Sequence, residues 1–204
     1  MLNAQADFSS NIKQANGLET LYDQLTKALG PSASFDDLLR SQLVYAVSAF
    51  DKLLHDLIRI GMVQIFASAG RAPTAKYLND SIPMNVVSQL LAPVAIQPIE
   101  ITFENLIREK HSVLSFQDPK KVADGLSYIW AEEHKWNKIA VKMGLTEDQA
   151  RKQLSLIVTR RNAMVHEADM DPVTRQKQPI SQVMSRFSSD FLQKLGDVIC
   201  SLVI

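Results

Sequence analysis

Cysteine and long apolar runs are the first things that this sequence lacks. Its one thiol, Cys200, lies in the apolar run 198–203 and has no partner for an intrachain disulfide. A single thiol in such a run is typical of a buried side chain in the reducing cytoplasm, so we predict a cytoplasmic location. No apolar stretch approaches the roughly 18 residues of a membrane span, and residues 1–10 lack the features of a signal peptide. We therefore expect neither a transmembrane helix nor a membrane partner.

An excess of charge is also missing, since 22 Lys and Arg residues balance 22 Asp and Glu residues. A neutral chain has no overall field to attract nucleic acid, so any RNA site must be a local patch. The sequence contains no glycine-rich phosphate loop, no dinucleotide fingerprint and no nucleophile elbow. The four histidines show no metal-ligand spacing: His55, His111, His134 and His166. We accordingly expect no metal and no cofactor.

The alternation of polar and apolar residues typical of strands is absent as well, whereas apolar residues recur at helical spacing. We predict an all-α fold, a bundle of about five principal helices in a single domain over residues 1–204. Prolines break up residues 70–98, which we interpret as an insertion of short helices, with helical turns near 74–80 and 84–91. The N-terminal helix lies within 1–30. The periodicity predicts helices over 11–29, 35–69, 99–116, 119–144, 147–167 and 181–203.

Helix boundaries carry recognisable capping signals. Thr146 with Gln149 three residues later predicts a capping box at the start of helix 147–167. Asp118 followed by Pro119 predicts an N-cap with proline at the first helical position. Ser34 is predicted to cap the long second helix in the same way. These signals predict the residues at which the helices begin.

One residue of helix 147–167 conflicts with its surroundings. Arg161 falls in the apolar stripe, four residues after Ile157 and three before Met164. Because a guanidinium stays charged, it needs an anion or a partner interface on a face that is otherwise buried. The alternative is that a carboxylate of another helix pairs with it, or that its head group extends to water.

His166 shares a helix face with Asn162, four residues earlier, and lies about 140° around a regular helix from Arg161. One regular helix therefore does not aim Arg161 and His166 at the same point. Two copies of the chain meeting at these helix ends would do so, and so would a distorted last turn. A histidine at a helix end also has a plain structural use, as a favourable charge near the C-terminal dipole.

The long second helix is interrupted by polar residues, among them Asp51 and Asp56. A solvated face is the simple interpretation of these positions. The functional alternative is that Asp51 or Asp56 orients Arg161 or His166 from across the bundle.

The segment 161–167, Arg-Asn-Ala-Met-Val-His-Glu, resembles the signature of the HEPN superfamily, an Arg with a polar neighbour and a His a few positions later. Residues 47–57 resemble an early helix of that family. Residues 115–122 resemble the segment before the motif helix in the RiboL-PSP type of HEPN domain. Together the three stretches give a resemblance that covers roughly residues 35–200.

The resemblance implies a helical domain that forms a homodimer with its motif helices facing each other. Such domains often act as metal-independent endoribonucleases in toxin or antiviral defence systems, with RNA, and in some cases an antitoxin or defence protein, as partners. Arg161, Asn162 and His166 would then be the catalytic residues. Arg160 is a candidate contact for a substrate phosphate, and the equal alternative is a solvated charge. Some members carry a tyrosine two residues after the histidine. This chain has Ala168 there, so the resemblance does not imply regulation through that tyrosine.

Two further functional hypotheses remain open. The domain could be a non-catalytic module that binds RNA or a protein, with Arg161 and His166 only structural at a dimer interface. It could also be the immunity or regulatory partner of a separate enzyme. Replacement of His166 by alanine separates an enzyme from a scaffold, because only the enzyme loses cleavage while it stays folded and dimeric.

Overall fold

A computed structural model describes residues 1–30, 34–92 and 97–204. Helices hold 72% of the residues and the described ranges contain no strand, which confirms the predicted all-α class. The helices are, in order, α1 (Leu2–Leu29), α2 (Asp36–Phe66), α3 (Ala75–Leu78), α4 (Met84–Leu90), α5 (Ile99–His111), α6 (Pro119–Leu126), α7 (Lys135–Met143), α8 (Glu147–His166) and α9 (Gln182–Val203).

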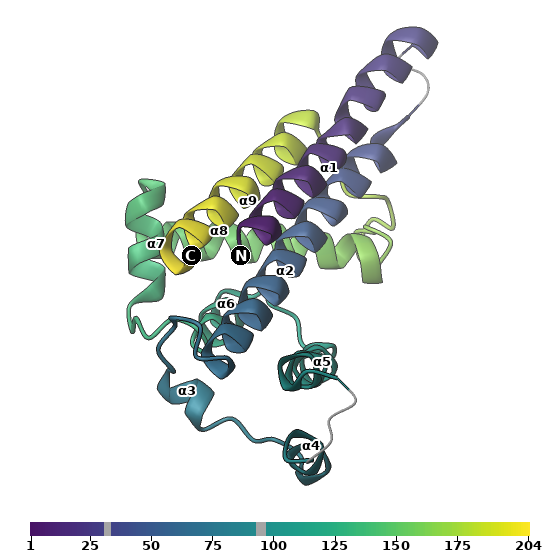
Figure 1. Ribbon diagram of the computed structural model, residues 1–204. Helices are drawn as coiled ribbons and strands as arrows, with labels where there is room; N and C mark the ends of the chain where they lie inside the picture. The colour runs from purple at the N-terminus through teal and green to yellow at the C-terminus, as the bar shows by residue number, and fades with distance from the viewer. Residues whose placement is uncertain (31–33, 93–96) are drawn as a thin grey trace.

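Three long helices, α1, α2 and α9, run side by side and form the main layer of the molecule (Figure 1). They approach each other closely at Gly196 of α9. A Cβ atom there would lie 2.3 Å from Cε1 of Phe8 and 2.9 Å from Cδ2 of Leu53, so a larger residue would overlap both side chains. Glycine at this position lets the three helices meet over the buried rings and methyl groups of the core.

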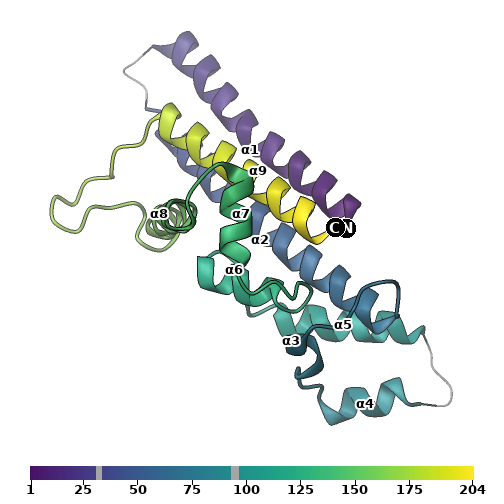
Figure 2. The same ribbon diagram turned by 90° about the vertical axis from the view of Figure 1, so that its left-hand side faces the viewer.

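The helix with the Arg–His motif crosses this layer. Figure 2 shows α8 end-on beside α2, with α7 next to it. Helix α8 packs against α2, α6 and α7. Its buried residues, Ala150, Leu154 and Ile157, follow the spacing of one helix face. The motif is therefore carried by a helix whose first half is fixed in the core.

Most of the predicted helix starts are confirmed. Thr146 and Gln149 form the capping box of α8, and the Asp118 carboxylate accepts from the backbone N–H of Lys120 at the start of α6. The short helices α3 and α4 match the turns predicted within the insertion. The prediction for Ser34 is wrong, because α2 begins after Phe35 with no side-chain cap.

The N-terminal helix is longer than predicted, since α1 begins at Leu2 rather than near residue 11. Ala4 and Phe8 extend the buried stripe of Ile12 and Ala15 toward the N-terminus at helical spacing. Polar residues separate these two side chains in the sequence and hide the pattern. Packing against α2 and α9 makes them part of the core.

The predicted helix over 119–144 is wrong, because the structure has two helices there. Helix α6 ends at Leu126 and α7 begins at Lys135. The Trp136 indole N–H donates to the carbonyl of Pro119 over 2.7 Å, which brings the start of α7 back beside the start of α6. A straight helix would place these residues about 25 Å apart, at 1.5 Å per residue. The count of about five principal helices is therefore not confirmed.

The predicted helix over 99–116 also ends early, at His111. The following segment turns back onto α2, where the Asp51 carboxylate accepts from the backbone N–H of Phe116 over 2.6 Å. A bond to a backbone N–H competes with continued helix, because that N–H is no longer free for a carbonyl four residues earlier. The segments 47–57 and 115–122, which both resemble the HEPN family, are joined by this contact.

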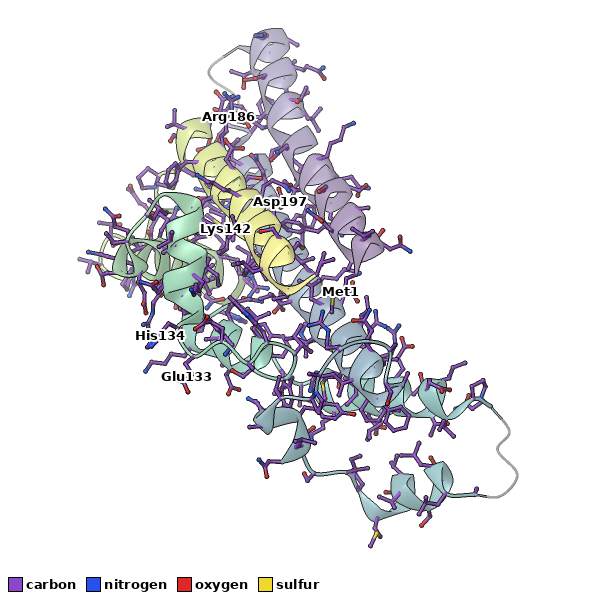
Figure 3. The ribbon with its side chains drawn as sticks, turned by 60° about the vertical axis from the view of Figure 1, so that its left-hand side comes forward. Met1, Glu133, His134, Lys142, Arg186 and Asp197 are labelled. Atoms are coloured by element: carbon purple, nitrogen blue, oxygen red, sulfur yellow. The ribbon has the colours of Figure 1, made fainter. Side chains whose placement is uncertain are left out.

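The two chain ends described here lie together (Figure 1). Arg71, just after α2, donates to the carbonyl of Val203 and to the sulfur of Met1, and its other amino group donates to the carbonyl of Ile129 over 2.8 Å. Figure 3 shows Met1 beside the end of α9. No helix within the described ranges has the length and hydropathy to cross a bilayer.

A buried histidine lies at the end of α5. His111 is 3% exposed, packs near the rings of Phe116 and Tyr128, and has no hydrogen-bond partner for either ring nitrogen among the described residues. Burial lowers the pKa of His111 to about 4, and the neighbouring His55, Lys110 and Lys76 act in the same direction against Asp80. Folding therefore favours the neutral ring.

This histidine makes the fold sensitive to acid. Below pH 6.5 the unfolded chain binds a proton at His111 that the folded chain binds only near pH 4, so stability falls as the pH is lowered across that window. We expect the wild type to lose about 2–3 kcal/mol more than the His111→Leu variant between pH 7 and pH 4. Urea unfolding of both proteins across this range measures the difference, and equal losses would contradict the prediction.

Candidate active site

The Arg–His motif occupies the last turn and a half of α8. This helix is continuous from Glu147 to His166, so of the two alternatives the structure does not show a distorted last turn. Five residues of regular helix place Arg161 and His166 about 140° apart around the axis. Arg161 points to the side of the buried Ile157, and His166 points to the opposite side. A single chain does not bring the two side chains to one point.

Arg161 is partly buried and has an unusual set of partners. One terminal nitrogen, Nη1, donates to Oδ1 of the neighbouring Asn162 over 3.1 Å. Its Nε is buried and has no partner, and none of the described carboxylates forms an ion pair with it. Pairing with a carboxylate of another helix is thus not what the structure shows. The guanidinium remains available to an anion from outside the chain.

His166 is the last residue of α8 and is exposed to solvent, as is Asn162 on the same side of the helix. Its side chain makes no hydrogen bond within the described residues. The backbone that follows His166 is held by hydrogen bonds, because the N–H groups of Glu167 and Asp169 both donate to the carbonyl of Ala163. The imidazole is therefore free to meet a substrate or a second chain.

Arg160 has a different environment from its neighbour. One terminal nitrogen, Nη2, donates to Oδ2 of Asp169 over 2.9 Å and to the carbonyl of Pro179 over 3.1 Å. The other terminal nitrogen donates to the side chain of Gln178. The predicted contact of Arg160 with an RNA phosphate stays a prediction, and its terminal donors are already occupied by protein acceptors.

Asp169 is the residue that the sequence interpretation missed. It is 1% exposed and its Oδ2 also accepts from Nε of Arg40 over 2.7 Å, so it joins α2 to the end of α8. Arg40 donates in addition to the carbonyl of Gln178 over 2.8 Å. The available signal was Arg40 itself, a charged residue between the core residues Leu39 and Leu43. It indicated a buried anion without saying which one.

The comparison with known proteins gives a family match. The sequence profile of the RiboL-PSP-HEPN family matches residues 9–202. The chain belongs to the RiboL-PSP-HEPN family. HEPN domains are helical and are often ribonucleases. The family therefore suggests a function related to RNA. No curated protein and no solved structure matches the chain.

The two carboxylates expected to support the HEPN motif are engaged elsewhere. Asp51 accepts from Phe116 and from the side chain of Gln117, and Asp56 pairs with Lys52 and Arg59. The positively charged partners of Asp56 lower its pKa against the opposing effect of burial. Within the chain neither carboxylate forms a hydrogen bond or ion pair with Arg161 or His166, because both hold α2 to its neighbours.

Unpartnered buried atoms gather at the HEPN motif. Five buried side-chain nitrogen or oxygen atoms in the described ranges lack a hydrogen-bond partner, and three of them belong to Arg160, Arg161 and Asp169. Such atoms are rare in folded proteins and are often found at functional sites. No three His, Cys, Asp or Glu side chains of the described ranges come close enough to hold a metal ion. What the site offers is two arginines, an amide and an imidazole.

Proposed function

We propose that this HEPN domain is a metal-independent endoribonuclease with a composite site formed by two copies of the chain. The observation that carries the proposal is the divergence of Arg161 and His166 on a regular helix, with neither side chain paired to a carboxylate. A two-fold axis near the end of α8 would bring the Arg161 of one copy toward the His166 of the other. Family membership supports the same chemistry.

RNA supplies its own nucleophile for this reaction. The ribose 2′-oxygen attacks the adjacent phosphorus and loses its proton to one imidazole, while the bond from phosphorus to the 5′-oxygen breaks and that oxygen takes a proton. The products are a 2′,3′-cyclic phosphate and a free 5′-hydroxyl. The His166 that faces the partner copy's Arg161 would take this proton and deliver it to the 5′-oxygen, since an imidazole can both accept and donate a proton.

Arg161 would stabilise the charge that develops on the phosphorane oxygens. A guanidinium is suited to this because its planar donors match two phosphate oxygens. Asn162 already accepts a hydrogen bond from Arg161 and would hold its terminal nitrogens in place. The presence of a charged arginine in an apolar stripe, which is unfavourable for folding, then has a functional reason.

An apolar side chain in the last turn of α8 fits an interface with a second copy. Val165, next to His166, is 46% exposed. A second chain packed on the end of α8 would remove such surface from water, which favours association. In this proposal the enzyme acts in the cytoplasm as a toxin or antiviral effector, and an antitoxin or defence protein restrains it.

The composite site is tested by mixing two inactive variants in EDTA. Arg161→Ala and His166→Ala are each expected to lower cleavage by about 10²-fold or more. After the two proteins are unfolded, mixed and refolded together, about one quarter of the wild-type activity should return, because half of the dimers are mixed and each has one intact Arg–His pair. The assay measures cleavage of labelled RNA and identifies the terminal cyclic phosphate.

The other outcomes of this experiment are informative. If mixed dimers form but activity does not return, Arg161 and His166 act within one chain and the composite site is wrong. If the wild type cleaves only with added Mg²⁺, the metal-independent mechanism is wrong. If wild-type dimers cleave none of a broad set of cellular RNAs, the domain is a binding or regulatory module.

A further inference from the structure

We propose that Asp169 is the positioning residue for His166 and that it acts through Arg40 and Arg160. This inference rests on the proposed ribonuclease function. It concerns how a side chain at the C-terminal end of a helix is held for catalysis. It starts from one buried carboxylate three residues beyond His166.

The carboxylate of Asp169 joins two helices. Its Oδ2 accepts from Arg40 of α2 over 2.7 Å and from Arg160 of α8 over 2.9 Å. The exposed fractions of the side chains are 1% for Asp169, 10% for Arg40 and 15% for Arg160. An anion between two cations in this setting has little competition from water, so the three groups hold each other in one arrangement. The end of the motif helix is thereby fixed to the central helix.

The backbone of Asp169 is held as tightly as its side chain. Its N–H donates to the carbonyl of Ala163 over 2.9 Å, and its carbonyl accepts from the N–H of Gln178 over 2.8 Å. Ala168 and Asp169 have φ angles of 50° and 60°, in the left-handed region that residues with a Cβ rarely adopt. Two such residues in succession persist only where the surrounding contacts determine them, and here Asp169 provides those contacts.

The loop after Asp169 closes on the same cluster. Residues 169–178 leave the end of α8 and return to it, as Figure 2 shows for the segment between α8 and α9. Arg40 and Arg160 both donate to the carbonyl of Gln178, and Met170 pairs with Lys177 across the base of the loop. Both ends of the loop are therefore attached to the two arginines that bind Asp169.

Removal of this carboxylate should loosen the last turn of α8. The final carbonyl groups of a helix lack partners within the helix, so the turn that carries His166 depends on contacts beyond it. An imidazole that moves by about 1 Å from its productive place can lose on the order of 10²-fold in rate. Because Asp169 is buried, its effect on RNA would pass through the position of His166 rather than through contact with substrate.

The test compares Asp169→Ala with a matched control, Glu19→Ala. Glu19 is also a buried carboxylate paired with an arginine, Arg186, which Figure 3 labels on α9. Full-length proteins are compared at a temperature where circular dichroism shows each to be folded. The two readouts are the cleavage kinetics in EDTA and the NMR signals of the His166 ring, assigned from the spectrum of His166→Ala.

We expect Asp169→Ala to lower kcat by about 10²-fold with KM nearly unchanged, and to shift or broaden the His166 ring signals. Glu19→Ala should leave kcat and these signals unchanged. Asp169→Asn keeps an oxygen for the two arginines and should recover part of the rate. It also serves as the test variant if Asp169→Ala does not fold.

Two results would overturn the inference. One is an unchanged His166 signal in the folded Asp169 variant, which is decisive even if the wild type shows no cleavage and the proposed function itself has failed. The other is an equal loss of kcat in Glu19→Ala, since any loss of stability would then explain the effect. A selective loss together with a shifted His166 signal supports the positioning role.

Discussion

Replacement of His166 by alanine is expected to lower the rate of RNA cleavage by about 10²–10⁴-fold, the range typical of a lost general acid or base. The fold should not change, because the His166 side chain is exposed and makes no hydrogen bond within the described residues. Light scattering should find the same dimer for wild type and variant. The measurement is the initial rate with a labelled RNA in EDTA.

A matched control for this variant is His134→Ala. His134 is also exposed and is the N-cap residue of α7; Figure 3 labels it. Its removal should leave the rate within about twofold of the wild type, since an exposed substitution away from a site has little effect. If both variants cleave like the wild type, His166 is not catalytic. If His166→Ala is monomeric, the histidine serves the interface rather than the reaction.

The second large effect is expected at Arg161, where activity and stability should change in opposite directions. Arg161→Met should lower cleavage by about 10²–10³-fold, as the loss of a group that stabilises developing charge does. The same substitution should raise the free energy of unfolding by about 1 kcal/mol, because a thioether suits the apolar stripe and removes the unpartnered Nε. Urea unfolding and RNA cleavage measure the two effects.

The neighbouring arginine provides the control. Arg160→Met should lower the free energy of unfolding by about 1–3 kcal/mol, because it removes charged hydrogen bonds to Asp169 and to the carbonyl of Pro179. The two variants remove the same charge at adjacent positions, so net charge cannot explain a difference between them. Destabilisation by Arg161→Met equal to that by Arg160→Met would show that Arg161 is a structural residue.

The sequence alone predicted some features of the site and not the difference between Arg160 and Arg161. Arg161 could be singled out because a charged residue at a position of the apolar stripe is visible from spacing alone. His166 could be placed on the opposite side of the helix for the same reason. The different uses of Arg160 and Arg161 could not be predicted, because they depend on Asp169 and Gln178 folding back onto α8.

Long-range packing also explains the errors in the helices. The spacing of the apolar residues predicted one helix over 119–144. The contact of Trp136 with Pro119 favours two helices instead. Asp51 and Asp56 were interpreted as possible supports of the motif, but their hydrogen-bond partners come from residues that only the fold brings near.

The sequence by itself determined the all-α class, the capping box of α8, and the divergence of Arg161 and His166 around that helix, because these features depend on local spacing and local hydrogen bonds. It also carried enough of the motif to show the RiboL-PSP-HEPN resemblance. The tertiary structure alone decided that Asp169 is buried between Arg40 and Arg160 and that Arg161 has no carboxylate partner among the described residues. Ion pairs between distant segments follow from the packing of whole helices, and spacing along the chain does not encode them.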